Sequence, residues 1–325
     1  MTTTNGNDVI LSVRNLQTHL RTRRGVVKAV DGVSFDVRRG ETLGIVGESG
    51  SGKSMTAFSI VQLLPRVGRV VGGEVMFNGE DLLKKSSHQM EKVRGKHISM
   101  VLQDPLTSLN PVFRTGDQIS ETIRHHLPHA PDPKGKAVEL MRQVRIPAPE
   151  TAYRYYPHQM SGGMRQRVLG AIGVSCEPEF LIADEPTSAL DPTIQAQYLD
   201  LLKDLQKQYN LTIIFITHDF GIVATICDTV AVMYAGKIVE TGPVQEVFRR
   251  PQHPYTEALL KSLPSLEEKP LRLPAISGQP PMPHEMPVGC RFAPRCPYKF
   301  DKCDEYPPDT HISATHISAC WRSVK

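Results

Sequence analysis

The chain has 325 residues and a formal net charge of +4, with 22% charged residues, which is the ordinary balance of a soluble protein. This length suffices for two domains, or for one large domain with an extension. No basic stripe with interleaved aromatic residues occurs, so the composition argues against a nucleic-acid partner. No apolar run reaches the roughly 18 to 20 residues that span a bilayer, and the polar N-terminus lacks a secretory apolar core. We therefore expect a cytosolic protein that meets a membrane only through partners.

The first segment predicts a β region. Strand-like runs at 9–13, 33–37 and 73–77 alternate with turns at Arg39-Gly40 and Asn78-Gly79. A further apolar run, at 41–47, leads directly into a glycine-rich loop.

Residues 47–54 read GESGSGKS, a complete G-x-x-x-x-G-K-[ST] phosphate loop. It lies between the predicted strand and an apolar helical pattern at 55–64, the order that this motif requires. We expect its three glycines to take positive φ and to turn backbone N–H groups toward a nucleotide phosphate. Lys53 would then reach the β- and γ-phosphates of ATP or GTP, and Ser54 would bind Mg²⁺. The nucleotide-binding residues predicted here are Gly47, Glu48, Ser49, Gly50, Ser51, Gly52, Lys53 and Ser54.

Helical patterns interrupted by prolines dominate the region from about 104 to 176. Near its end, Ser161, Gly162 and Gly163 open an apolar helical pattern. A helix N-terminus of this kind offers free backbone donors, so the sequence predicts a second anion site.

The run at 180–185 reads FLIADE, the form of a buried strand that delivers carboxylates to a phosphate site. Asp184 suits the Mg²⁺ shell. Glu185, one residue on, points elsewhere and suits a general base that polarises an attacking water. Apolar or β-branched runs at 212–217 and 229–232 are typical of strands buried on both faces of a mainly parallel sheet.

In this order, the motifs resemble those of the ATP-binding cassette (ABC) ATPases over about the first three quarters of the chain. The resemblance matches Gln103 to the glutamine that senses Mg²⁺ and the attacking water, and His218 to the switch histidine at the γ-phosphate. It matches 161–163 to the signature that caps a nucleotide bound by the opposite subunit, and Asp191 to the loop that couples the two sites. It implies that Lys53, Gln103, Glu185 and His218 are the catalytic residues.

The fold implied is an α/β phosphate-loop domain with a mainly parallel sheet, an antiparallel β subdomain and a helical subdomain at about 104–176. We expect this nucleotide-binding domain to cover 8–244 and a Cys/Pro-rich extension to cover 245–325. The family usually stacks adenine on an aromatic residue, but residues 1–34 contain no Phe, Tyr or Trp. His19, Arg24 or Val27 would have to supply that face.

The runs QDPLTSLNP at 103–111 and HPYT at 253–256, with the tail that follows, are similar to the ATPase subunits of bacterial oligopeptide and dipeptide importers. That branch implies a head-to-tail dimer with a second, identical or paralogous ATPase subunit. It also implies two membrane permease subunits, indirect work with an extracytoplasmic substrate-binding protein, and a peripheral location on the cytoplasmic face. A nickel or opine importer and a soluble non-transport ABC ATPase remain alternatives.

The extension carries Cys290, Cys296, Cys303 and Cys320. In a cytosolic chain such clustering favours metal over disulfides, and four thiolates suit a [4Fe-4S] cluster. A zinc site remains an alternative, although the paired C-x2-C spacing typical of zinc sites is missing. Free or disulfide-bonded cysteines are the third alternative. The resemblance adds that importer subunits with this tail hold such a cluster. Since the ATP site lies in another segment, we expect Cys303→Ser to destabilise the tail and to spare nucleotide binding.

Overall fold

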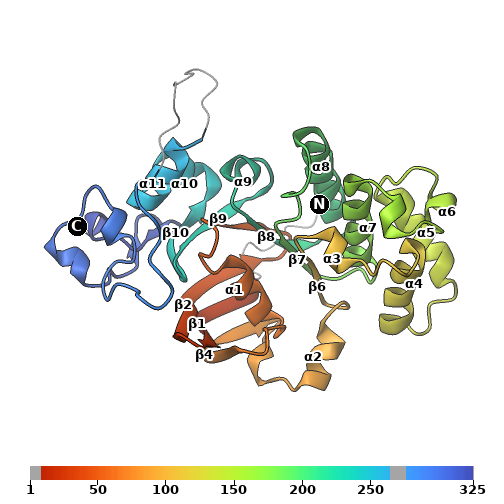
Figure 1. Ribbon diagram of the computed structural model, residues 1–325, viewed down its shortest axis with the longest axis horizontal. Helices are drawn as coiled ribbons and strands as arrows, with labels where there is room; N and C mark the ends of the chain where they lie inside the picture. Colours follow the sequence, from red (N-terminus) through yellow and green to blue (C-terminus); the bar gives the residue numbers. More distant parts are fainter. Residues whose placement is uncertain (1–8, 264–275, 325) are drawn as a thin grey trace. The chain divides into compact units, whose positions relative to one another are not determined.

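The computed structural model describes residues 9–263 and 276–324. The chain divides into two compact units (Figure 1). The described parts of 1–38, 42–83 and 217–325 form the first unit, and residues 39–41 and 84–216 form the second. No helix within the described ranges is long and apolar enough to cross a membrane.

The first unit contains an antiparallel sheet in the order β2-β1-β4-β5. Its strands are β1 (Val9–Thr22), β2 (Gly25–Arg38), β4 (Gly68–Phe77) and β5 (Glu80–Asp81). The runs at 9–13, 33–37 and 73–77 are therefore only parts of longer strands. Bulges shift the register between β1 and β2, for example between Val13 and Leu16, so the alternation of apolar residues loses its period along the strand. Helix α1 (Lys53–Ile60) contacts β1 where Thr18 and Ser59 share a buried hydrogen bond of 2.7 Å.

The same unit carries strand β3 (Thr42–Val46), which pairs in parallel with β9 (Thr229–Tyr234). Strand β10 (Lys237–Pro243) pairs antiparallel with β9, and the short strands β12 (Ile317–Ser318) and β11 (Thr310–His311) extend this edge. The same unit contains helices α9 (Phe220–Ile226), α10 (Val244–Arg249) and α11 (Pro254–Lys261), which share an apolar core with β3, β9 and β10. Val230, Val232 and Phe220 are among the core residues between these elements.

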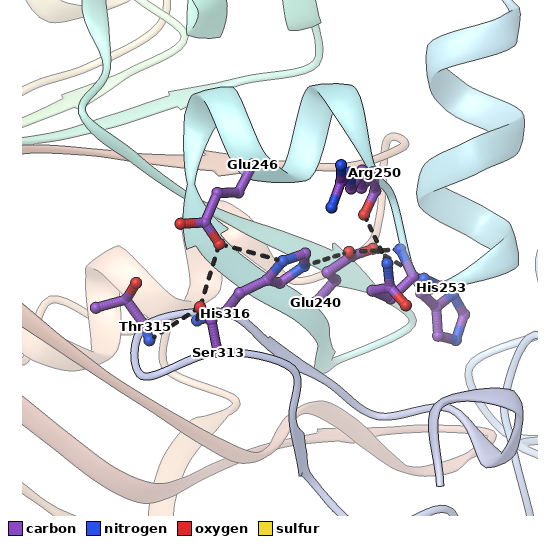
Figure 2. Close-up of polar contacts among 8 residues, drawn as sticks. Glu240, Glu246, Arg250, His253, Ser313, Thr315 and His316 are labelled. Carbon is purple, nitrogen blue, oxygen red and sulfur yellow. Dashed lines mark hydrogen bonds and ion pairs between the residues drawn. The ribbon is translucent and has the colours of Figure 1, made fainter. Parts of the chain in front are cut away.

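The end of the chain is bound to β10 through a buried carboxylate, that of Glu240 (Figure 2). The side chain of Glu240 is fully buried and accepts the backbone N–H groups of Gln252 and His253 at 2.8 and 3.0 Å. Nε2 of His316, just before β12, lies 2.8 Å from the same carboxylate. Figure 2 shows the His316 ring between Glu240 and Glu246, whose carboxylate is 3.7 Å from Nδ1. Strand pairing and these polar contacts hold the C-terminal segment on the sheet.

The second unit contains strands β6 (Ile98–Val101), β7 (Phe180–Asp184) and β8 (Thr212–Thr217), with β7 parallel to both neighbours. The strand predicted at 212–217 is confirmed with both ends correct. All residues of β7 and β8 are buried, as expected for strands covered on both faces. The last residue of β8, Thr217, falls in the first unit.

Helices make up most of the remaining second unit, and the region predicted as helical at about 104–176 contains five of them. The helices are α2 (Ser87–Val93), α3 (Pro105–Ser108), α4 (Thr115–His126), α5 (Pro133–Gln143), α6 (Pro149–Ala152), α7 (Gly162–Val174) and α8 (Pro192–Tyr209). Pro133 and Pro149 begin helices, because the first helical position needs no N–H donor and suits the fixed φ of proline.

Candidate functional site

The phosphate loop connects β3 to α1 in the first unit. Gly52 has φ +106°, and an added Cβ would lie 2.4 Å from the carbonyl oxygen of Ala29. Gly47 does not take positive φ, which corrects the sequence-based expectation for this glycine. It is required for another reason: a Cβ there would lie 2.0 Å from the carbonyl oxygen of Met233 on β9. The predicted positive φ is confirmed at Gly50 and Gly52.

The side chain of Lys53 lies inside this loop and is 4% exposed. Its ammonium donates to the carbonyl oxygens of Gly47 at 2.8 Å and Glu48 at 3.1 Å. The hydroxyl of Ser51 is also buried and has no hydrogen-bond partner within the described residues. A buried cation and an unsatisfied hydroxyl at the start of α1 are what a phosphate group would satisfy, so the loop fits the nucleotide predicted for it. Ser54 follows in the first turn of α1.

The acidic pair lies at the end of β7 in the second unit. Asp184 is the last residue of the strand and is 3% exposed. Glu185 has φ +45°, an uncommon value for a residue with a side chain, which turns the chain sharply after Asp184. Nε2 of Gln103, just after β6, donates to Oε2 of Glu185 at 3.1 Å. The structure thus brings together Gln103 and Glu185, which are 82 positions apart.

The predicted signature lies at the N-terminus of α7. Ser161 is the N-cap, and its hydroxyl accepts the N–H of Met164 at 3.3 Å. Gly163 is packed closely, since an added Cβ would lie 2.7 Å from Ile194 of α8, whereas Gly162 has open space around it. Asp191 caps α8 by accepting the N–H groups of Thr193 and Ile194. Asp191 therefore has a local structural role whatever its part in coupling two sites.

His218 is exposed and follows β8 in the first unit. The next residue, Asp219, caps α9 with its carboxylate. The cap fixes the chain next to His218, whose assignment as the switch histidine stays a prediction. The adenine-stacking candidates His19, Arg24 and Val27 lie in β1, in the turn after it and in β2, and their role stays a prediction.

Two residues of the extension, neither of them in the predicted site, contact the phosphate loop. The hydroxyl oxygen of Tyr255, in α11, accepts the N–H of Glu48 at 2.9 Å. The guanidinium of Arg295 binds the carboxylate of Glu48 through two nitrogens, at 2.7 and 3.1 Å. The tail therefore contacts the loop, although the two are far apart in the sequence. Tyr255 belongs to the HPYT run, which was the one available signal; nothing in the sequence pattern indicated Arg295.

His253, in the same run, is fully buried, and burial lowers its pKa to about 4. Its Nδ1 accepts the N–H of Tyr255 at 3.1 Å and so caps α11. The neutral ring thus fixes the start of the helix that carries Tyr255.

The four cysteines of the tail, Cys290, Cys296, Cys303 and Cys320, line one small cavity whose other walls are mainly apolar and aromatic side chains. All six cysteines lie in the described part of the chain, and each is a free thiol. Burial raises the pKa of three of the tail thiols, that of Cys290 to about 11. Within 9–263 and 276–324 no group of three or more His, Cys, Asp or Glu side chains is arranged to hold a single metal ion.

Two protein-family models match the chain, each over a different part of it. Residues 30–188 match the ABC transporter family, and residues 239–303 match the C-terminal region of oligopeptide and dipeptide transporters. The chain is 50% identical to the oligopeptide transport ATP-binding protein OppD of Bacillus subtilis over 317 residues, which covers 96% of this chain and 88% of that protein. It is 48% identical to the dipeptide transport ATP-binding protein DppD of the same organism, over 96% of this chain and 94% of that one.

Solved structures show the same fold. The protein cbiO1 of Clostridium perfringens, part of an ABC transporter complex, has a TM-score of 0.65 and 30% identity, over 75% of this chain and 92% of that chain. A dimeric ATP-binding cassette, MJ0796, bound to ADP and phosphate also has a TM-score of 0.65, with 24% identity over 72% of this chain and 98% of that one.

Proposed function

Since the chain belongs to the ABC transporter ATPases, and to the group with an oligopeptide/dipeptide transporter C-terminal region, we propose that it energises import of di- and oligopeptides through a separate permease. The observation that carries this proposal is a complete phosphate loop in one chain with that C-terminal region. The names of the relatives favour peptides over nickel or opines. No residue of this chain contacts the transported substrate in this scheme, so the substrate is selected elsewhere.

The catalytic roles follow from the chemistry of each side chain. Lys53, buried in the loop, offsets charge on the β- and γ-phosphates, and Ser54 and Asp184 supply oxygen ligands for Mg²⁺. When bound, Mg²⁺ neutralises charge that develops on the phosphates. Glu185 takes a proton from the attacking water as general base, and Gln103, hydrogen-bonded to it, holds its carboxylate in place. His218 contacts the γ-phosphate.

The partners follow from the signature. The N-terminus of α7, with Ser161 as its cap and open space at Gly162, caps a nucleotide held by the phosphate loop of a second ATPase subunit, identical or paralogous. Closure of this head-to-tail dimer drives two permease subunits, and a substrate-binding protein outside the cell delivers the peptide. The protein then acts as a peripheral subunit on the cytoplasmic face of the membrane.

Uptake of a labelled tripeptide by cells that lack the gene tests this function. Wild-type protein should restore uptake, and Glu185→Gln protein, expressed at the same level, should not. Nickel uptake, measured in the same cells, serves as the comparison. Restored nickel uptake without peptide uptake would assign the transporter to another substrate.

We further propose that Cys290, Cys296, Cys303 and Cys320 hold a [4Fe-4S] cluster that stabilises the tail. The donor set fits, because four thiols line one cavity with aromatic walls. A cluster would add folding energy to a proline-rich segment with little secondary structure. Zinc is the alternative, although the paired C-x2-C spacing that is typical of zinc sites is missing from the tail.

Anaerobic purification tests this assignment. The protein should be brown, with broad absorbance near 400 nm and about four irons per chain. Stoichiometric zinc in a colourless protein, or no metal at all, would refute it.

A further inference from the structure

A turn of the tail lies against the phosphate loop and its support. Residues 290–296 are closed by backbone hydrogen bonds, in which Ala293 donates to Cys290, and Cys296 donates to Ala293. Phe292 of this turn is 1% exposed and packs edge-on against Tyr234 of β9, with ring centroids 5.4 Å apart. Such aromatic packing fixes the turn on the first unit.

Arg295 extends from this turn to the loop. Its contact with Glu48 is bidentate, and this geometry makes arginine–carboxylate pairs strong and directional. The side chain is 4% exposed, and it also donates to the hydroxyl oxygen of Tyr234 at 3.3 Å and to the carbonyl of Ser277 at 3.0 Å. Burial alone would lower the pKa of Arg295, but its hydrogen bonds to Glu48 and Tyr234 raise it, so the guanidinium remains charged.

Glu48 is held at three points. Arg295 binds its carboxylate, Tyr255 accepts its N–H, and its carbonyl accepts a hydrogen bond from Lys53 at 3.1 Å. Tyr255 and Arg295, both from the extension, therefore bind the same residue whose carbonyl binds Lys53. A shift of Glu48 would move the carbonyl against which the Lys53 ammonium is placed.

A second contact supports the same loop from the same turn. The guanidinium of Arg291 donates to the carbonyl of Ala235 and pairs with Asp31. Gly236, which follows Ala235, donates its N–H to the carbonyl of Ser51 in the phosphate loop at 2.7 Å. The tail thus contacts the loop directly at Glu48 and supports it indirectly at Ser51, through Ala235 and Gly236.

We propose that Arg295 is a positioning residue of the ATP site, which holds Glu48 and through it Lys53, so that the tail sets the geometry of the phosphate loop. Arg295 itself does not touch the nucleotide. This inference rests on the ATP-binding role of the loop and is independent of the transported substrate and of the group held by the thiols. The ATP site would then respond to the folding state of the tail.

The test measures MgATP affinity of the full-length chain for wild type, Arg295→Gln and Glu48→Gln. Each variant should weaken affinity roughly tenfold, because small displacements of positioning groups have large effects. Both variants should melt at a lower temperature, because each leaves a polar group of the buried pair without its partner, so affinity is measured well below the melting temperature. The metal content should stay at the wild-type value. Lys299→Gln is the matched control, since Lys299 is a half-exposed tail cation paired with Asp304 at 3.0 Å.

The double variant separates positioning from independent damage. If Arg295 acts through Glu48, Arg295→Gln combined with Glu48→Gln should weaken affinity no more than either change alone. Arg295→Lys keeps the charge but not the bidentate geometry, so it should bind MgATP more tightly than Arg295→Gln and less tightly than wild type. Wild-type affinity in both single variants, or a fully additive loss in the double variant, would overturn the proposal. If Arg295→Gln does not fold, the affinities of Arg295→Lys and Glu48→Gln decide, since lysine keeps the charge and Glu48 is 28% exposed.

Discussion

At the scale of single residues, Glu185 combines backbone strain with a side-chain contact. Its φ of +45° costs free energy that the surrounding structure has to supply, and such values are frequent at functional sites. Its N–H donates to the carbonyl of Ile216 at 2.9 Å, and its carbonyl accepts from the hydroxyl of Ser188. These bonds hold the turn that carries the Glu185 side chain.

Replacing Glu185 with Gln should keep ATP binding and reduce turnover by roughly 10²-fold or more, because the amide cannot accept the proton of the attacking water. ATP hydrolysis under saturating MgATP measures the effect. Glu150→Gln, a change at an exposed carboxylate of the same unit, is the control. Near-normal hydrolysis by the Glu185 variant would remove this residue from the role of base.

Lys53→Ala should weaken nucleotide binding itself, because it removes the buried charge that faces the phosphates. Calorimetric titration with MgATP measures the loss of affinity. Lys207→Ala, at an exposed position in the last turn of α8, should bind as wild type does. Unchanged affinity in the Lys53 variant would contradict the assignment of the phosphate loop.

At the scale of elements, short strands need a further anchor. Strands β11 and β12 have two residues each and present little apolar surface, so pairing alone gives them little stability. The buried carboxylate of Glu240 supplies the anchor through His316. The carboxylate of Glu240 also accepts the N–H groups of Gln252 and His253, just before α11. This one side chain therefore connects β10, the start of α11 and the segment before β12.

His316→Ala should lower the free energy of unfolding by about 1–3 kcal/mol, because it leaves the buried Glu240 carboxylate with one partner fewer. Urea unfolding and limited proteolysis of the C-terminal segment measure the change. His311→Ala, at an exposed position of β11, is the matched control. Equal unfolding free energies for the two variants would show that the Glu240 contact contributes nothing.

At the scale of the whole molecule, the signature and the phosphate loop are expected to act in different chains. If the protein forms homodimers, mixing Lys53→Ala chains with Ser161→Arg chains can produce one intact composite site. Such a mixture should recover part of the ATPase activity that each variant lacks alone. Heterodimers that form without recovery would indicate that each chain works alone or that both sites must act together.

The sequence by itself determined the motifs and the elements that carry them. The phosphate loop, the acidic end of β7 and the helix start at Ser161 depend on residues close together in the chain, and so their patterns were sufficient. Local reasoning was weaker where the backbone departs from regular periods. Bulges in β1 concealed the length of the first strands, and prolines that seemed to interrupt helices in fact begin two of them.

Only the tertiary structure decided which distant segments touch. Gly47 is required by the backbone of β9, which approaches it from 186 residues further along the chain. Arg295 and Glu48 are separated by 247 positions, and their contact depends on the packing of Phe292 beside Tyr234 and Tyr255. No local pattern encodes such a contact, because a charged side chain in a loop is usually solvated. Its partner is set by the apolar core that brings the two segments together.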